Sequence, residues 1–110
     1  MESKFRYRLS HLAKTDLDDI VSYIAVELAN PQAATKFSDS LERTIDEVCT
    51  FPESGSPVNN EFLSNKEVRK KFVGNYIIYY VPVPNEKLIY VIRIVYGKRN
   101  MDNIFRELNF

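Results

Sequence analysis

The chain has 110 residues and a mass of 12.8 kDa, and we expect residues 1–110 to form a single domain of ordinary size. Its 45% of apolar and 27% of charged residues exclude fibrous and disordered proteins, and its formal net charge of zero disfavours a strongly basic nucleic-acid binder. No apolar run approaches the roughly 18 residues of a membrane-spanning helix, and no signal peptide is recognisable, so we expect a cytoplasmic protein that does not bind a membrane.

The first half of the chain predicts one strand and two helices. Residues 5–9 alternate apolar and basic side chains, as in a half-buried edge strand. Ser10 is a good N-cap for a helix over residues 11–28, and Asn30 followed by Pro31 begins a second helix that ends near residue 51. Because the connection is short, we expect an antiparallel helical hairpin with one apolar side. The apolar positions of the two helices are Leu12, Leu17, Ile20, Val21, Ile24 and Leu28, then Ala34, Phe37, Leu41, Ile45 and Val48.

The second half predicts a loop, three antiparallel strands and a short helix. Residues 52–67 contain helix-breaking prolines and polar residues without periodicity, so we expect a long loop. Turn residues at Gly74-Asn75 and at Pro84–Glu86 separate strands over 68–73, 76–82 and 87–96. A short terminal helix is predicted over 100–108. The fold class is therefore α/β in the α+β sense, in the order β-α-α-β-β-β, with an antiparallel sheet packed on the helical hairpin.

Both faces of the two central strands are apolar. In one strand Tyr76, Ile78 and Tyr80 lie opposite Ile77, Tyr79 and Val81, and in the next Leu88, Tyr90, Ile92 and Ile94 lie opposite Ile89, Val91 and Val95. Two helices cover one face of such a sheet. We therefore expect a partner over part of the other face.

The sequence lacks the usual motifs of phosphate, dinucleotide and metal sites, and we expect no cofactor and no metal. His11, the sole histidine, is expected at the surface or in a helix cap. Asp16, Asp18 and Asp19 are expected to interact favourably with the dipole at the start of the helix rather than to bind a metal. The single cysteine, Cys49, excludes an intramolecular disulfide and fits a reducing compartment.

Cations recur at the strand ends of the second half. Residues 1–62 hold 6 basic and 11 acidic side chains, whereas residues 63–110 hold 9 and 4. Either the two halves attract each other in the fold, or the basic half forms a functional face. Metal-free ribonuclease chemistry needs a base, cations and an acid, and Lys70, Tyr96 and Arg99 are the evident candidates for it. The alternative is a solubilising rim that pairs with the acidic helices.

The chain resembles the RelE/ParE superfamily of toxins from type II toxin–antitoxin systems over almost its whole length. The resemblance rests on YRLSHLAKTDLDDIVSYI, NPQAATKF, FPESGSP, the strand that Arg69 begins, NYIIYYV and IRIVYGKRN, in that order. It implies a toxin that a cognate antitoxin neutralises by wrapping an amphipathic segment over it, in a hetero-oligomer. Growth inhibition and plasmid stabilization are the implied roles.

Two branches of the superfamily imply different targets. RelE-like members cleave messenger RNA on the ribosome, whereas ParE-like members inhibit DNA gyrase. Ile77 and Phe105 stand where RelE has an arginine and a tyrosine, although Arg99 matches its Gly-Lys-Arg motif. The long helical hairpin and Arg69 favour ParE, with a departure at Tyr96, where many ParE sequences have histidine.

We therefore expect a ParE-like toxin that acts on DNA gyrase by protein contact and is not an enzyme. Its predicted target-binding residues are Arg69, Lys70, Arg93, Tyr96, Lys98 and Arg99. The alternatives are a RelE-like endoribonuclease, acting on ribosome-bound messenger RNA through Lys70, Tyr96 and Arg99, and an inactive member that retains only antitoxin binding.

Overall fold

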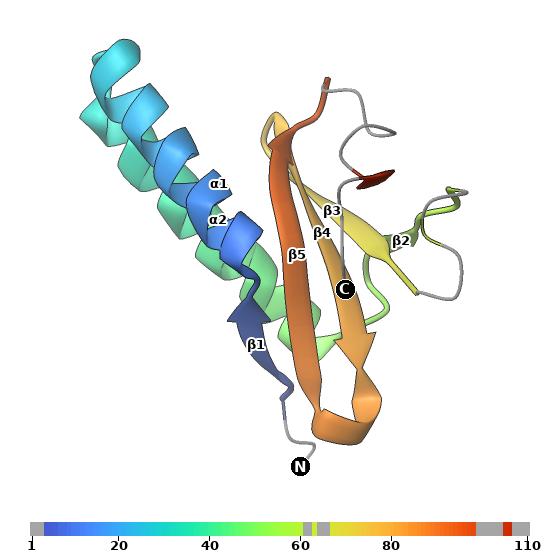
Figure 1. The fold of residues 1–110 in the computed structure, drawn as a ribbon. Coiled ribbons are helices and arrows are strands. Elements are labelled where there is room, and N and C mark those ends of the chain that lie inside the picture. The colour runs from blue at the N-terminus through green and yellow to red at the C-terminus, as the bar shows by residue number, and fades with distance from the viewer. Residues whose placement is uncertain (1–3, 61–62, 64–66, 99–104, 107–110) are drawn as a thin grey trace.

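The computed structural model describes residues 4–60, 63, 67–98 and 105–106 and arranges them in two layers (Figure 1). A hairpin of two helices lies on one face of a five-stranded sheet with the strand order β1-β5-β4-β3-β2. This α+β arrangement confirms the predicted order of elements. It adds one short strand, β2 (Ser56–Pro57), within the segment that was expected to be a loop without strands.

Both helices begin at the predicted caps. The side chain of Ser10 accepts a hydrogen bond from the Ala13 N–H at the start of α1 (His11–Ser22), and the side chain of Asn30 accepts one from the Ala33 N–H at the start of α2 (Pro31–Thr50). These bonds satisfy N–H groups that have no partner within the helix. The predicted apolar face of α2 is buried throughout.

The first helix differs from the prediction at its end. Its α-helical part stops at Ser22, and a π-helical turn, η1 (Tyr23–Glu27), follows, with the Leu28 N–H donating to the Tyr23 carbonyl oxygen at 3.0 Å. A π turn contains more residues than an α turn, so positions after it rotate out of the α-helical pattern. Leu28 is consequently 55% exposed, and Leu12, in the first turn of α1, is also exposed, so the prediction that these two residues join the buried stripe is wrong.

Three strands form the predicted antiparallel meander: β3 (Arg69–Val73), β4 (Tyr76–Val83) and β5 (Leu88–Tyr96). Gly74 has a φ of 59° in the first turn, a conformation that glycine adopts without a steric penalty, and η3 (Pro84–Glu86) forms the second turn. β1 (Arg6–Leu9) lies at the sheet edge as expected but pairs with β5 in parallel, so the antiparallel prediction is wrong there. The helical hairpin and three further strands lie between β1 and β5 in the chain, and so long a connection permits the parallel pairing.

The sheet is apolar on both faces, as predicted. Ile78 and Tyr80 pack beneath the helices, whereas Ile77 and Tyr79 lie on the opposite face, which we call the outer face. On the outer face the chain supplies its own cover around Tyr79, through Leu63, Val68, Phe105 and the partly buried Val58, where a partner was expected. The segment expected to be a plain loop therefore closes part of the core.

A β-bulge in β5 changes the predicted alternation. Tyr79 pairs with Arg93 but Tyr80 pairs with Val91, so Ile92 is an extra residue in the ladder. Ile94 consequently packs beneath the helices while Ile92 packs on the outer face, and the prediction that both share one face is wrong.

Two further expectations concern the ends of the chain and the membrane. Of the predicted helix over residues 100–108, Phe105 and Arg106 are helical, and its other residues, with Asn100 and Asn103 as its expected caps, lie outside the described residues. In the part of the chain that the structure describes, no helix combines the length and apolarity that crossing a membrane requires.

Candidate functional site

Arg93, a predicted target-binding residue, is buried and cross-links β5 to α1. Its side chain donates from Nε and Nη2 to the two carboxylate oxygens of Asp16 at 2.8 and 2.9 Å, and the Ile94 N–H donates to the same carboxylate at 2.9 Å. Arg93 is 7% exposed. A bidentate pair of this kind fixes both the orientation of the guanidinium group relative to the carboxylate and the distance between them. Asp16 therefore holds the sheet to the helix, where the sequence predicted a role on the helix dipole.

Arg69, a second predicted target-binding residue, holds the segment before β2. Its Nη1 donates to the carbonyl oxygens of Gly55 at 2.7 Å and Glu53 at 3.2 Å. Tyr80 completes the clamp, since its hydroxyl donates to the Pro52 carbonyl oxygen and accepts from the Gly55 N–H, both at 2.9 Å. Burial raises the pKa of Tyr80, and the hydrogen bond from Gly55 opposes that rise. We call Arg69, Tyr80 and Gly55 the loop clamp.

Gly55 is required by the loop clamp because no side chain fits at its position. A Cβ atom there would lie 2.5 Å from the Tyr80 hydroxyl oxygen and 2.7 Å from the Lys70 carbonyl oxygen. Backbone and ring approach each other more closely than a Cβ atom allows. The glycine of the FPESGSP segment is therefore explained by packing within the fold.

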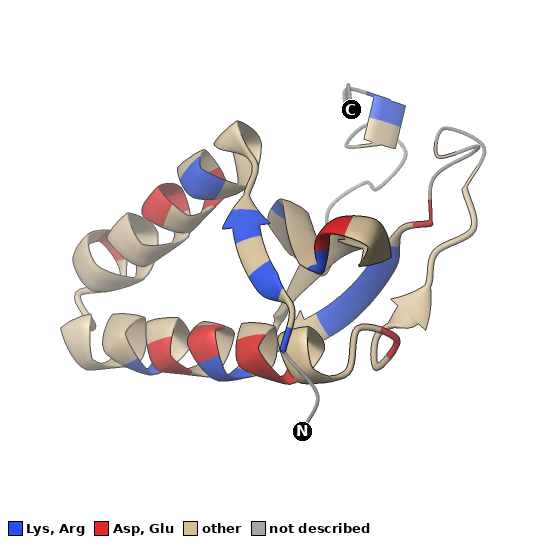
Figure 2. Ribbon diagram, turned by 90° about the horizontal axis from the view of Figure 1, so that it is seen from below, with Lys and Arg blue, Asp and Glu red and all other residues tan. Residues whose placement is uncertain are grey.

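The charges of the two halves meet across the helix-covered face. Lys71 forms an ion pair with Glu47 of α2, and Arg93 forms one with Asp16 of α1. Figure 2 shows the acidic residues along the helices and the basic residues along β1 and β3. The acidic and basic halves of the chain therefore attract each other in the fold, and Lys71 and Arg93 of the basic half take part in this attraction.

The remaining predicted cations are more accessible. Lys70 is half-buried on the outer face with its Nζ 5.8 Å from the centre of the Phe72 ring, and Phe72 is 63% exposed. Lys98 is exposed just after β5, and Arg99 lies outside the described residues. Of the predicted target-binding residues that the structure describes, Lys70, Tyr96 and Lys98 are therefore the ones that a target can reach, and the exposed Phe72 ring lies beside Lys70.

The sheet separates two of the three residues that were candidates for ribonuclease chemistry. Lys70 pairs across the ladder with Tyr79, which lies on the outer face. Tyr96 pairs with Tyr76, whose ring also contacts Phe37 of α2 beneath the helices. Because directly paired residues share a face of a sheet, Lys70 and Tyr96 lie on opposite faces.

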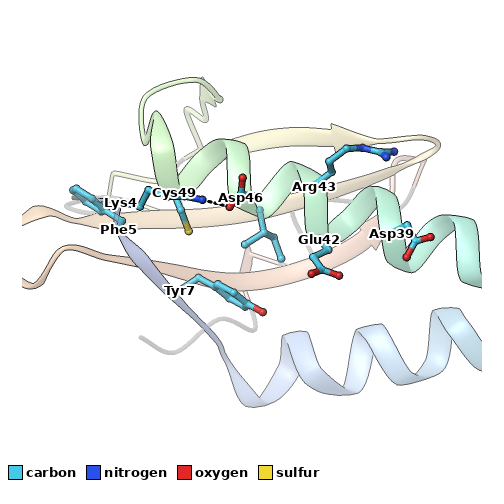
Figure 3. A pocket seen from close by; sticks show the side chains of 9 residues that line it. Lys4, Phe5, Tyr7, Asp39, Glu42, Arg43, Asp46 and Cys49 are labelled. Atoms are coloured by element: carbon cyan, nitrogen blue, oxygen red, sulfur yellow. Dashed lines mark hydrogen bonds and ion pairs between the residues drawn. The ribbon is translucent and has the colours of Figure 1, made fainter. Parts of the chain in front are cut away.

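A groove lies between β1 and α2, and we call it the edge groove (Figure 3). Its volume is about 510 Å³, and its lining includes Phe5 and Tyr7 from β1 and the segment before it and the exposed acids Asp39, Glu42 and Asp46 from α2. Lys4 pairs with Asp46 at one end, where the buried Cys49 has a pKa raised by burial and by Asp46 and lowered by Lys4. Sequence reasoning missed this groove because its walls are 30 or more residues apart. The alternation in residues 5–9 was its one local signal.

The edge groove runs beside backbone groups of β1 that have no partner among the described residues. The N–H groups of Arg6 and Ser10 donate to the carbonyl oxygens of Lys87 and Val91, toward β5. Alternate residues of a strand direct their backbone groups to opposite sides. The N–H and C=O groups of Tyr7 and Leu9 therefore point to the free edge, where an added strand can bind them.

Among the described side chains, no group of three or more His, Cys, Asp or Glu is placed to hold a metal ion. His11 is exposed at the first residue of α1.

Comparisons with known proteins agree with this architecture. The model of the ParE toxin of the type II toxin–antitoxin system parDE matches residues 7–101. None of the curated proteins matches the sequence. Among solved structures, the chromosomal ParDE system from P. aeruginosa is similar at 18% identity and a TM-score of 0.67, over 86% of this chain and 98% of that one.

Two RelE structures are also similar. The RelBE2 toxin–antitoxin complex from Mycobacterium tuberculosis has 16% identity and a TM-score of 0.59, over 86% of this chain and 99% of that chain. A mutant of the E. coli toxin RelE in the free state has 13% identity and a TM-score of 0.58, over 96% of this chain and 100% of that chain. At these identities the likenesses establish a shared fold. The family model, however, matches most of the sequence, and the chain therefore belongs to the ParE toxin family of type II toxin–antitoxin systems.

Proposed function

We propose that this toxin inhibits DNA gyrase through protein contact rather than by cleaving RNA. The observation that carries the proposal is the placement of Lys70 and Tyr96 on opposite faces of the sheet. An acid and a base must both reach the scissile phosphate in metal-free RNA cleavage. With Ile77 and Phe105 at the positions of two RelE side chains, the described residues favour the ParE-like branch.

In this proposal the outer face and the end of β5 contact the target. Lys70, Tyr96 and Lys98 are accessible there, and Phe72 adds an exposed aromatic ring of the kind that anchors protein interfaces. Arg69 and Arg93 act indirectly, because the loop clamp and the Asp16 pair hold the strands that carry the accessible residues. Arg99 remains a predicted contact outside the described residues.

We further propose that the cognate antitoxin binds along β1 and forms a hetero-oligomer with the toxin. The free N–H and C=O groups of Tyr7 and Leu9 suit an added strand, and the edge groove beside them accepts its side chains. The solved relatives include a toxin–antitoxin complex, which supports a partner of this kind. The exposed acids of α2 favour basic residues in the antitoxin segment.

The target is tested by two assays on one preparation. Purified toxin is added to gyrase supercoiling reactions and, in parallel, to translating ribosomes whose messenger RNA is then mapped for cleavage. We expect loss of supercoiling and intact messenger RNA. Lys70→Glu should weaken the inhibition, whereas Lys14→Glu, which makes the same charge change on exposed α1, should not.

Three outcomes would redirect the proposal. Cleaved messenger RNA with normal supercoiling would favour the RelE-like alternative. Growth arrest without either effect would assign another target. Expression without growth arrest would identify an inactive member that retains only antitoxin binding.

The antitoxin site is tested by Tyr7→Pro, which removes an outward N–H without touching the bonds that β1 makes to β5. We expect weaker capture of the toxin by its tagged cognate antitoxin. Tyr7→Phe keeps the ring and the N–H and should bind normally. Equal capture of both variants would place the antitoxin elsewhere.

A further inference from the structure

A second, smaller pocket lies beneath the end of β5, beside α1, and we call it the tyrosine pocket. Its volume is about 150 Å³, and its lining includes Asp16, Asp19, Ile20, Tyr76, Ile94 and Tyr96. The Tyr76 and Tyr96 rings form one wall, with centroids 5.7 Å apart and an angle of 68° between their planes. Phe37 packs edge-on against Tyr76 at 5.1 Å and supports it from α2. One wall of the pocket is therefore aromatic, and Ile20 and Ile94 add aliphatic lining.

The tyrosine pocket contains one carboxylate without a counter-charge. Asp16 is neutralised by Arg93 and by the Ile94 N–H, so its charge is already compensated. Asp19, one turn further along α1, is exposed, and within the described residues it forms no ion pair. Burial, with smaller contributions from Tyr23 and Tyr96, raises the pKa of Tyr76, so its ring stays neutral at physiological pH. The net character of the pocket is aromatic and singly negative.

Size and chemistry together restrict what this pocket can accept. Pockets for drug-sized ligands and cofactors have volumes of roughly 300–1,000 Å³, and this one is about half the smallest of them. It is the right size for the end of one side chain. Aromatic faces beside a carboxylate attract cations, and a guanidinium group, which is flat and weakly hydrated, stacks on a ring while it donates to the carboxylate.

We propose that the tyrosine pocket anchors an arginine side chain of a partner protein. The guanidinium group stacks on the exposed Tyr96 ring, beside Tyr76, and donates to Asp19, and the aliphatic part of the arginine covers Ile20 and Ile94. This assignment goes beyond the proposed function, because it holds whether or not the partner is gyrase. It also gives Tyr96 a defined task at a position where many ParE sequences have histidine.

The test uses a small probe and needs no partner protein. N-acetyl-L-argininamide is titrated into the isotopically labelled toxin, and amide chemical shifts are followed by NMR, with N-acetyl-L-lysinamide as the comparison. We expect saturable shifts at Asp19, Ile94 and Tyr96, with arginine bound about two- to fivefold more tightly than lysine. Asp19→Asn and Tyr96→Leu should each weaken arginine binding by about two- to fivefold, since each removes one surface contact.

Matched variants separate a built pocket from general attraction. Asp18→Asn makes the same charge change at an exposed neighbour outside the pocket and should bind arginine normally. Tyr96→Phe retains the ring and should also bind. The proposal is overturned if the shifts do not saturate, if lysine binds equally well, or if Asp18→Asn weakens binding as much as Asp19→Asn. Because gyrase is absent from this titration, its failure is distinct from failure of the supercoiling assay.

Discussion

The two faces of the sheet use similar residues in different ways. Beneath the helices, basic residues are paired with acids of α1 and α2, and the apolar residues form a continuous cluster. On the outer face the cover comes from Val58, Leu63, Val68 and Phe105, and Lys70 and Phe72 retain solvent contact. The helix-covered face therefore fixes the fold, whereas the outer face combines structural cover with accessible groups.

This contrast divides the cations that sequence analysis treated as one set. Arg93 and Arg69 make several hydrogen bonds within the chain, and a charge held that way is poorly placed to contact a partner. Lys70 has a ring contact with Phe72 and remains accessible. Position in the sheet, rather than charge, decides which cations are available to a target.

The largest effect is expected from Asp16→Asn, which attacks the helix-covered face. The change leaves the buried Arg93 without its counter-charge, and breaking a buried pair in this way costs about 3–5 kcal/mol in the free energy of unfolding. Urea denaturation measures the loss. Asp18→Asn, on the exposed side of the same helix, should change the free energy by no more than about 0.5 kcal/mol.

The double variant Asp16→Leu with Arg93→Leu refines this prediction. Removal of both partners leaves no unpaired charge, so the double variant should be more stable than Asp16→Asn. If Asp16→Asn were as stable as Asp18→Asn, the pair would not hold β5 to α1, and the contrast between the faces would lose its main support.

A smaller loss is expected from Gly55→Ala in the loop clamp. The added Cβ atom would meet the Tyr80 hydroxyl oxygen at 2.5 Å, and overpacking of this kind costs about 1–3 kcal/mol. Thermal or urea unfolding measures it, and Ser56→Ala, at the neighbouring exposed residue, is the control. The cost of Gly55→Ala should fall in a Tyr80→Phe background, where the hydroxyl is missing. If Gly55→Ala cost the same free energy in the natural and the Tyr80→Phe backgrounds, Gly55 and Tyr80 would not be in the close contact that defines the loop clamp.

Local signals in the sequence were sufficient for most of the fold. Ser10 and Asn30 cap their helices, Gly74 forms the first hairpin turn, and strict alternation assigns Ile77 and Ile78 to different faces. Each of these depends on residues within a few positions of one another. They are therefore readable from the sequence by local rules.

Features that depend on distant residues could not be predicted in the same way. The bulge at Ile92 is defined by the register against Tyr79 and Tyr80, and nothing near Ile92 in the sequence indicates it. The parallel pairing of β1 likewise depends on the position of β5 about 80 residues later. The Asp16–Arg93 pair and the edge groove follow from these long-range placements. They required the three-dimensional arrangement.

Alkaline pH should destabilise the outer face through Tyr79. Burial raises the pKa of Tyr79 above its ordinary value of 10.0 in the folded protein. As pH rises, the unfolded chain therefore loses the phenolic proton before the folded chain does. The contribution of the neutral Tyr79 side chain to the free energy of unfolding is fully present below pH 10.0 and is lost as pH rises through the higher folded pKa. The free energy of unfolding, measured with urea from pH 7 to 11, should fall less steeply for Tyr79→Phe than for the natural sequence. Identical slopes would indicate that Tyr79 is accessible to water.

The smallest effect on stability is expected at Phe72, and its neighbour supplies the direct comparison of the two faces. Val73 is 3% exposed beneath the helices, whereas Phe72 is 63% exposed on the outer face. Threonine suits a strand at both positions. Val73→Thr buries a hydroxyl and should cost about 1–3 kcal/mol, while Phe72→Thr should change the free energy of unfolding by no more than about 0.5 kcal/mol.

Function should respond in the opposite order. Because Phe72 is an exposed ring beside Lys70, its loss should weaken the proposed inhibition of gyrase more than the loss of Val73 does, when each variant is assayed at a temperature at which it is folded. Equal inhibition by Phe72→Thr and the natural sequence would remove Phe72 from the target surface. A large stability loss in Phe72→Thr would instead assign Phe72 to the core, and the outer face would then serve the fold in the same way as the helix-covered face.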